Sequence, residues 1–94
     1  MRKTKLTNAF KRDQKRVDKS NIRSVIKQRF IYALKALAND EVLDYSYHDH
    51  ALTGNWAGYR ECHLAFDLVL IYRLEGNDLL VLEKIGSHSE VLGL

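Results

Sequence analysis

Residues 68–85 read LVLIYRLEGNDLLVLEKI, two apolar runs on either side of Gly76-Asn77. The first run, residues 68–74, is nearly continuous and rich in branched and aromatic side chains, which is typical of a strand covered on both faces. Gly-Asn between two such runs indicates a tight hairpin, so residues 78–85 are predicted to pair antiparallel with the first run. This hairpin forms the centre of the predicted sheet.

The segments that flank the hairpin predict a further strand and a short terminal helix. Residues 59–64 have strand character, and because side chains alternate along a strand, Glu61 is placed beside His63 on one face. Residues 45–55 lack periodicity. After the hairpin, Ser87 and Glu90 have the S-x-x-E spacing of a capping box. This spacing predicts one or two helical turns with His88 in the first.

The amino-terminal residues predict a short strand and a cationic helix. The strand is expected at residues 2–6, and Thr7 or Asn8 then serves as the N-cap of a helix over residues 9–19. Only Phe10 and Val17 mark the buried side of this helix. Its exposed face carries Lys11, Arg12, Lys15, Arg16 and Lys19.

A second, longer helix is predicted to begin after Ser20 or Asn21 as its N-cap and to close at Asn39-Asp40. Its apolar residues recur at helical spacing and form one stripe. These residues are Ile22, Val25, Ile26, Phe30, Ala33, Leu34 and Leu37.

Together these elements predict an α+β fold in which residues 1–94 form a single domain. Two N-terminal helices are expected to pack on one face of a small antiparallel sheet of three to four strands, with residues 2–6 as the edge strand. A short C-terminal helix completes the fold. The other face of the sheet is left open for a functional site.

Charge is divided unevenly along the chain, which the net charge of +3 conceals. Residues 1–40 hold 12 Lys/Arg against 3 Asp/Glu, a balance of +9, whereas residues 41–94 hold 3 against 9, a balance of −6. A basic face of this density favours polyanions such as nucleic acid. The alternative is a solvated helix surface, or one shaped for an acidic partner protein.

The single cysteine, Cys62, cannot form an intrachain disulfide, so the chain needs no oxidising compartment. No apolar run approaches the length of a membrane span, and no apolar segment of the signal-peptide type follows the basic amino terminus. A cytoplasmic protein without membrane attachment is therefore expected.

Chemically versatile side chains gather in residues 48–67, HDHALTGNWAGYRECHLAFD, which hold three of the four histidines. The fourth, His88, follows the hairpin. Histidines with a carboxylate and a lysine suffice to cleave RNA without metal. One group takes the proton of a 2′-hydroxyl, another protonates the leaving 5′-oxygen, and a cation stabilises the phosphorane. Imidazole suits both transfers because its pKa of about 6.5 lies near working pH.

Alternative interpretations of these residues stay open. Asp67, four residues after His63, would either orient that imidazole or simply cap a turn. His48 and His50 lie on the same side of an extended segment and would ligate zinc with a third histidine or the cysteine, although no spaced motif such as CxxC or HExxH is present. Trp56 would stack on RNA bases or, the preferred interpretation, anchor the core.

Lys84 follows Leu80 and Leu82 at alternate positions of the predicted strand, so it is expected on the same face as those leucines. A lysine at the end of a strand is usually a solubilising charge. With His88 four residues further on, an anion-binding role is the second interpretation.

The sequence resembles the YafQ branch of the RelE-type toxins of bacterial toxin–antitoxin pairs. The matching segments are DHALTGNWAGYRECHLAFDLVLIY, residues 49–72, and LLVLEKIGSHSEVLG, residues 79–93. The family patterns are roughly D-H-x-L-x-G-x-W-x-G-[YF]-R-[DE]-x-H-x-x-P-D-x-[LI]-[LI]-[IV]-Y and R-x-G-[ST]-H-[SA]-x-[LV]-[FL]. The basic helices agree only in character.

The resemblance implies a RelE-like fold and a small ribonuclease that enters the ribosomal A site. Such an enzyme cuts messenger RNA within a codon by 2′-hydroxyl attack, and it uses neither a metal nor a cofactor. The resemblance also implies a cognate antitoxin of the RelB/DinJ type that wraps and silences the toxin. Operator DNA is expected to be bound only through this antitoxin.

By position, the family's active-site histidines correspond to His50, His63 and His88, and its acidic residue corresponds to Asp67. Lys84 stands where the family has arginine, which keeps the charge but loses the bidentate fork. The implied roles are His88 as general acid, His50 or the His63/Asp67 pair as general base, and Lys84 as the partner of the phosphorane charge.

Two further departures from the family pattern are Leu92, in place of a carboxy-terminal Phe, and Phe66, in place of the Pro before the acidic residue. The first puts base stacking at that point in question, and the second is expected to loosen the turn. The residues expected to contact RNA or the ribosome are Lys11, Lys15, Arg16, Lys19, Arg60 and Leu92.

Two other functions stay open beside the ribonuclease. One is a catalytically inactive toxin-fold module, retained for antitoxin and operator binding after the Lys84 and Leu92 substitutions. The other is a zinc-dependent hydrolase that uses His48, His50 and His63.

Overall fold

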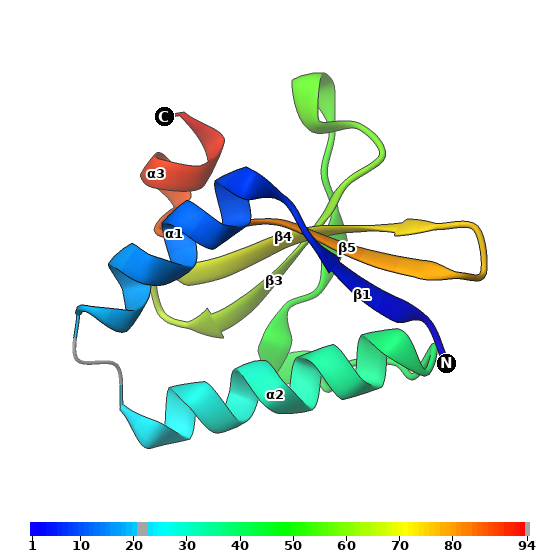
Figure 1. Ribbon diagram of the computed structural model, residues 1–94, viewed down its shortest axis with the longest axis horizontal. Coiled ribbons are helices and arrows are strands. Elements are labelled where there is room, and N and C mark those ends of the chain that lie inside the picture. Colours follow the sequence, from blue (N-terminus) through cyan, green and yellow to red (C-terminus); the bar gives the residue numbers. More distant parts are fainter. Residues whose placement is uncertain (21–22, 94) are drawn as a thin grey trace.

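The computed structural model describes residues 1–20 and 23–93. A five-stranded sheet has the order β1-β5-β4-β3-β2, and the long helix α2 (Ser24–Ala38) runs along one of its faces (Figure 1). The predicted α+β class is confirmed, but the sheet is larger than expected and is mixed, because β1 pairs parallel to β5. The strands are β1 (Lys3–Leu6), β2 (His50–Ala51), β3 (Arg60–Ala65), β4 (Leu68–Glu75) and β5 (Leu79–Gly86).

The β4–β5 hairpin is the centre of the sheet, as its apolar sequence predicts. Leu70 and Tyr72 of β4 are buried against the helices, whereas Val69 and Ile71 are buried in a smaller cluster on the opposite face. The hairpin loop has three residues, 76–78, rather than two, since Leu79 is already paired with Glu75.

An irregularity in this hairpin overturns the expected orientation of Lys84. Leu82 pairs with Tyr72, but the neighbouring residue of β4, Ile71, pairs with Lys84. One residue of β5 is therefore left over at this point. Residues paired across strands share a face. Lys84 therefore lies on the face of Ile71, opposite to the face of Leu80 and Leu82.

Helix α1 (Asn8–Asp18) is capped by Thr7, whose hydroxyl accepts a hydrogen bond from the Phe10 N–H at 3.0 Å. Phe10 is fully buried and stacks on Phe30 of α2 with ring centroids 6.3 Å apart. Asp13 is the unexpected residue of this basic helix: it is 8% exposed, and its Oδ2 accepts the backbone N–H of Ile85 at 3.1 Å.

Helix α2 (Ser24–Ala38) begins later than predicted, with Arg23 as its N-cap, so Ser20 is not the cap. The other predicted cap, Asn21, and the first residue of the predicted stripe, Ile22, lie outside the described residues. Most of the remaining stripe packs on the sheet, but Val25 is 53% exposed. No helix among the described residues is long and apolar enough to span a membrane.

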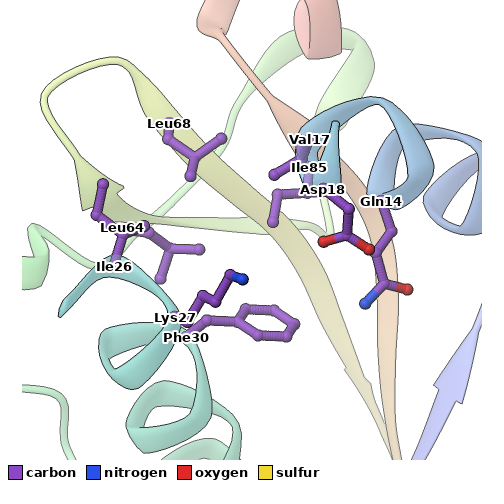
Figure 2. A pocket seen from close by; sticks show the side chains of 9 residues that line it. All are labelled: Gln14, Val17, Asp18, Ile26, Lys27, Phe30, Leu64, Leu68 and Ile85. Atoms are coloured by element: carbon purple, nitrogen blue, oxygen red, sulfur yellow. The ribbon is translucent and has the colours of Figure 1, made fainter. Parts of the chain in front are cut away.

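The seam between α1, α2 and the sheet contains a narrow cleft of about 50 Å³, lined mainly by apolar side chains (Figure 2). Val17 of α1, Phe30 of α2, and Leu68 and Ile85 of the sheet border it. Its volume is small beside the roughly 300–1,000 Å³ of typical ligand sites. The cleft is a packing seam, and it lies on the face of the sheet that carries no histidine.

We predict that Asp13→Ala lowers the free energy of unfolding by about 1–3 kcal/mol, because the Ile85 N–H is left buried without an acceptor. Asp18→Ala, an exposed aspartate of the same helix, serves as the control and is expected to change stability by less than about 0.5 kcal/mol. Urea denaturation of both variants measures the difference. Equal effects would contradict a structural role for the Asp13 carboxylate.

Candidate active site

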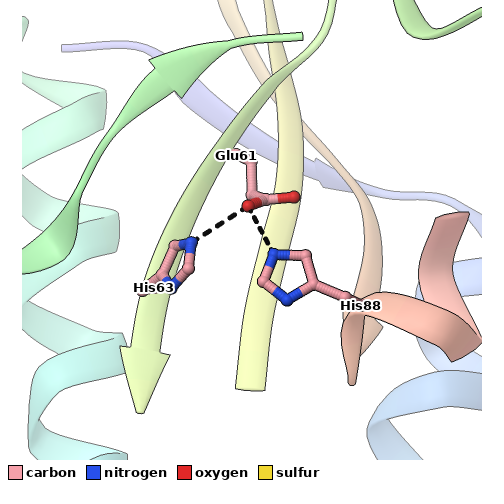
Figure 3. A group of neighbouring side chains, drawn as sticks. All are labelled: Glu61, His63 and His88. Carbon is pink, nitrogen blue, oxygen red and sulfur yellow. Dashed lines mark hydrogen bonds and ion pairs between the residues drawn. The ribbon is translucent and has the colours of Figure 1, made fainter. Parts of the chain in front are cut away.

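A buried carboxylate lies at the centre of the histidine cluster. The Glu61 side chain on β3 is only 2% exposed. Its Oε1 accepts hydrogen bonds from Nε2 of His63 at 3.0 Å and Nε2 of His88 at 2.8 Å (Figure 3). Nε2 of His50 lies 3.7 Å from the same oxygen. The structure thus brings together the three histidines predicted for the site, around a carboxylate that was not predicted.

The register of the sheet places these groups in one row. His50 of β2 pairs with Glu61, Glu61 pairs with Ile71, and Ile71 pairs with Lys84. All four side chains therefore stand on the face opposite to α1 and α2. Lys84 lies two strands away from Glu61, on the same face, and no carboxylate of residues 1–20 and 23–93 forms a salt bridge with it.

His88 is held by the short helix α3 (His88–Leu92), which begins with the predicted capping box: Ser87 Oγ accepts the Glu90 N–H, and Glu90 Oε1 accepts the Ser87 N–H. Asp67 Oδ1 accepts the backbone N–H of His88 at 3.2 Å and lies 3.5 Å from its Nδ1. The hydrogen bond that His88 donates to Glu61 raises the pKa of His88 above its usual value, and Asp67 adds to this effect.

The expected His63/Asp67 pair is therefore replaced by two other pairs. Asp67 contacts His88, and the carboxylate partner of His63 is Glu61. The reason is geometric: Glu61 and His63 are two apart on one strand and share a face, whereas Asp67 lies in the turn beyond β3, beside the start of α3.

His50 has a hydrogen-bonding pattern different from that of the other two. Its Nδ1 lies 2.8 Å from the carbonyl oxygen of His48, so Nδ1 carries the proton and donates it. In the neutral ring this leaves a lone pair on Nε2, the atom that faces the site. His48 has a left-handed backbone (φ 49°), and its ring lies 5.1 Å from that of His50 and 5.2 Å from that of His63.

The free edge of β3 is covered by an arginine. Because β2 has only two residues, the far half of β3 has no neighbouring strand on that side. Arg29 of α2 donates to the carbonyl oxygens of Leu64 at 3.0 Å and His63 at 3.3 Å, and its guanidinium stacks on the Tyr47 ring at 3.9 Å. This side chain therefore fixes the backbone that carries His63.

Arg60, predicted to contact RNA, lies on the helix side of the sheet, where it pairs across strands with Tyr72. It donates to Asp49 Oδ2 at 3.2 Å, and the Tyr72 hydroxyl donates to Asp49 Oδ1 at 2.6 Å. Burial and the bond to Asp49 raise the pKa of Tyr72. This network fixes Asp49, the residue before His50, so Arg60 has a structural role here.

The other residues predicted to contact RNA lie outside the cluster. Arg16 is committed to ion pairs with Glu90 of α3 at 3.1 Å and Asp13 at 3.4 Å. Leu92 packs against the small apolar cluster of Val69, Ile71 and Val91. Lys11 and Lys15 occupy exposed positions on α1, and the exposed Lys19 is its C-cap.

Trp56 is partly buried against the same cluster and meets Tyr59 edge to face with centroids 5.1 Å apart, as expected of a core anchor. Cys62 is fully buried on the helix side of β3, and burial raises the pKa of its thiol to about 12. A thiol with this pKa is a poor nucleophile and a poor metal ligand. Neither residue belongs to the histidine cluster.

Glu61 is the functional residue that sequence reasoning missed. The signal was present, because the strand pattern already placed Glu61 beside His63 on one face. A carboxylate two residues from a histidine is, however, a common surface pair, and its burial depends on strands and a helix that are distant in sequence.

The same geometry supplies ligands for a metal ion. Donor atoms of Glu61, His63 and His88 all lie within 4.8 Å of one another. A carboxylate with two imidazoles is a typical ligand set for zinc or copper. This set differs from the His48, His50 and His63 triad of the zinc-hydrolase interpretation.

Comparison with known proteins relates this geometry to one family. The family model described as "Bacterial toxin of type II toxin-antitoxin system, YafQ" matches residues 2–93. The mRNA interferase toxin YafQ of Escherichia coli K12 is 40% identical over 63 residues, which are 66% of this chain and 67% of that protein.

Two solved structures extend the similarity to the whole fold. The YafQ chain of the E. coli DinJ–YafQ complex superposes with a TM-score of 0.84 at 31% identity, covering 99% of this chain and 100% of that chain. A metal-bound toxin from Helicobacter pylori gives a TM-score of 0.86 at 32% identity, covering 97% and 99%. The chain belongs to the YafQ family of bacterial toxins of type II toxin–antitoxin systems.

Proposed function

We propose that this chain is an mRNA interferase, an endoribonuclease that cleaves messenger RNA on the ribosome by metal-independent acid–base chemistry. The observation that carries the proposal is the pair of unlike imidazoles around Glu61. Nε2 of His50 has a lone pair available, whereas both nitrogens of His88 face carboxylate oxygens. The name of the E. coli relative supports the same activity.

His50 is the general base in this mechanism. Donation from Nδ1 to the His48 carbonyl fixes the tautomer, so Nε2 accepts the proton of the ribose 2′-hydroxyl. The separation of 3.7 Å between Nε2 and Glu61 Oε1 is too long for a hydrogen bond, so the lone pair is not engaged there. The 2′-oxygen then attacks the adjacent phosphorus.

His88 is the general acid. Glu61 lies 2.8 Å from its Nε2 and Asp67 lies 3.5 Å from its Nδ1, and both carboxylates favour the protonated ring. As the P–O5′ bond breaks, the imidazolium gives its proton to the departing 5′-oxygen. The products are a 2′,3′-cyclic phosphate and a 5′-hydroxyl, and the two proton transfers balance.

The remaining groups stabilise charge and hold the geometry. Lys84 stands on the same face of the sheet and supplies a cation for the phosphorane oxygens. His63 donates to Glu61 and lies between the acid and the base, with its ring 5.1 Å from that of His88 and 6.2 Å from that of His50.

The proposed partners follow from the charge distribution and from the relatives. Exposed lysines of α1 dock on ribosomal RNA in the A site, an interaction that weakens steeply with salt. A cognate antitoxin of the RelB/DinJ type binds and silences the chain, as DinJ is bound to YafQ in the E. coli complex. Contact with operator DNA occurs only through that antitoxin. The site of action is the cytoplasm, where ribosomes translate.

Expression of the wild type in a bacterial host should arrest growth and leave cuts in a reporter transcript in phase with the reading frame. His88→Ala should reduce cleavage by about 10²–10⁴-fold, because the general acid is lost. Primer extension maps the cuts. Intact transcripts and normal growth with folded wild-type protein would favour the inactive binding module instead. Cuts in untranslated regions would contradict the need for the ribosome.

The pH dependence of cleavage should depend on Glu61. Activity requires protonated His88, so the rate should fall as pH rises through its pKa, which lies above 6.5. Glu61→Gln removes the charge that raises this pKa, so the alkaline limb of the pH–rate profile should move to lower pH. Asp18→Asn, which removes an exposed charge, is the control and should leave the limb in place. An unmoved limb in Glu61→Gln would contradict the assignment of His88.

Metal ions should inhibit this enzyme. A Cu²⁺ or Zn²⁺ ion bound by Glu61, His63 and His88 would occupy the atoms that exchange protons, so excess ion should abolish cleavage. Treatment of the purified protein with EDTA, followed by removal of the chelator before ribosomes are added, should leave its activity unchanged. Single-turnover cleavage on programmed ribosomes measures both effects. Loss of activity in EDTA, restored by Zn²⁺, would instead establish the zinc-dependent reaction.

A further inference from the structure

Beside the histidine cluster, the surface between α2 and the free edge of β3 is hollowed to about 580 Å³. The residues that line this hollow include His48 and His63 together with the apolar Ile26, Leu64 and Phe66. His63 also donates to Glu61, so the hollow is continuous with the catalytic cluster. Its volume lies in the range of sites that hold one small organic group.

Phe66 is the unusual residue of this surface. It is 99% exposed and occupies the first position of the two-residue turn between β3 and β4. A phenyl ring exposed in a turn does not pack in the core, and nearly all of its apolar surface stays in contact with water. Because Phe66 also lines the hollow, its exposed ring is available to a ligand there.

The charges around the hollow favour an anionic ligand. No carboxylate is among the described residues that line it. Arg29 donates hydrogen bonds to the carbonyl oxygens of Ser46, His63 and Leu64. Its positive charge is therefore present at the hollow, but these donors are already used within the protein. Polar groups that remain to meet a ligand include the exposed imidazole of His48, that of His63 and the hydroxyl of Ser46.

We propose that this hollow binds one unpaired nucleotide next to the scissile phosphate, with its base stacked on Phe66 and its ribose-phosphate against His48. The proposal rests on the proposed ribonuclease function. An aromatic ring beside cationic or hydrogen-bonding groups is the usual way in which proteins hold single-stranded RNA. A peptide segment of an antitoxin would instead be expected to bind in a longer apolar groove.

Stacking on Phe66 should appear in substrate binding rather than in proton transfer. Phe66→Ala should raise KM about tenfold or more on programmed ribosomes, with kcat and the pH profile little changed. Phe66→Trp should restore KM, and Phe66→Leu, which is apolar but not aromatic, should not. Tyr45→Ala is the matched control, because Tyr45 is 96% exposed and does not line the hollow.

His48 is tested by His48→Asn, because Asn tolerates the left-handed backbone that residue 48 adopts and keeps the carbonyl that orients His50. It should raise KM severalfold and shift the preference for the nucleotide beside the cut. Unchanged KM and preference in both His48→Asn and Phe66→Ala would overturn the subsite while leaving the ribonuclease in place.

A binding measurement separates failure of the subsite from failure of the proposed function. Messenger RNA with 2-aminopurine at one position beside the cut, and with a 2′-deoxyribose that blocks cleavage, is loaded in the A site. The wild type should quench its fluorescence and Phe66→Ala should not, whether or not the natural transcript is cut. Equal quenching by both proteins would refute the stacking. Weaker antitoxin binding in Phe66→Ala, with quenching and KM unaltered, would assign the ring to the antitoxin and also overturn the proposal.

Discussion

The buried carboxylate of Glu61 is the group on which the rest of the site depends. With 2% of its side chain exposed, it has lost its hydration, and a buried charge is tolerated only where hydrogen bonds replace water. Nε2–H groups of His63 and His88 supply these bonds. Because those histidines come from β3 and α3, the sheet and the C-terminal helix must meet at this point. The geometry of the site is therefore also a requirement of the fold.

Contacts distant from the reacting atoms maintain that meeting point. The two-residue strand β2 is just long enough to place His50 opposite Glu61, and Arg29 then satisfies the strand edge that a longer β2 would have covered. On the other side, the ion pair between Arg16 and Glu90 ties α3 to α1. The short β2 has a second effect: among the described residues, no further strand lies on the β2 side of the far half of β3, and the hollow lined by Arg29, His48 and His63 is found there.

Much of this arrangement could be predicted from the sequence, and the failures have identifiable physical causes. Alternation along β3 correctly placed Glu61 and His63 on one face, because period two holds in a regular strand. The same alternation rule predicts the wrong face for Lys84, because β5 contains an extra residue that is not detectable in the local sequence pattern. The pairing of Asp67 with His63, one of the two interpretations of their spacing, is wrong because the turn brings Asp67 to the start of α3. The five-stranded sheet was underestimated because a two-residue strand has no detectable periodicity.

The proton chemistry and the metal-binding geometry of this site are two consequences of one arrangement. Glu61 raises the pKa of His88 by stabilising its charged form, and a more basic imidazole also binds metal ions more strongly. Ligation requires the neutral ring, however, so protons and metal ions compete for it. Below the raised pKa the proton is favoured, and the ring is then in the form that the proposed cleavage mechanism requires of its acid. In the proposed mechanism the buried carboxylate makes catalysis near neutral pH possible, and the same carboxylate would also let copper or zinc occupy the site.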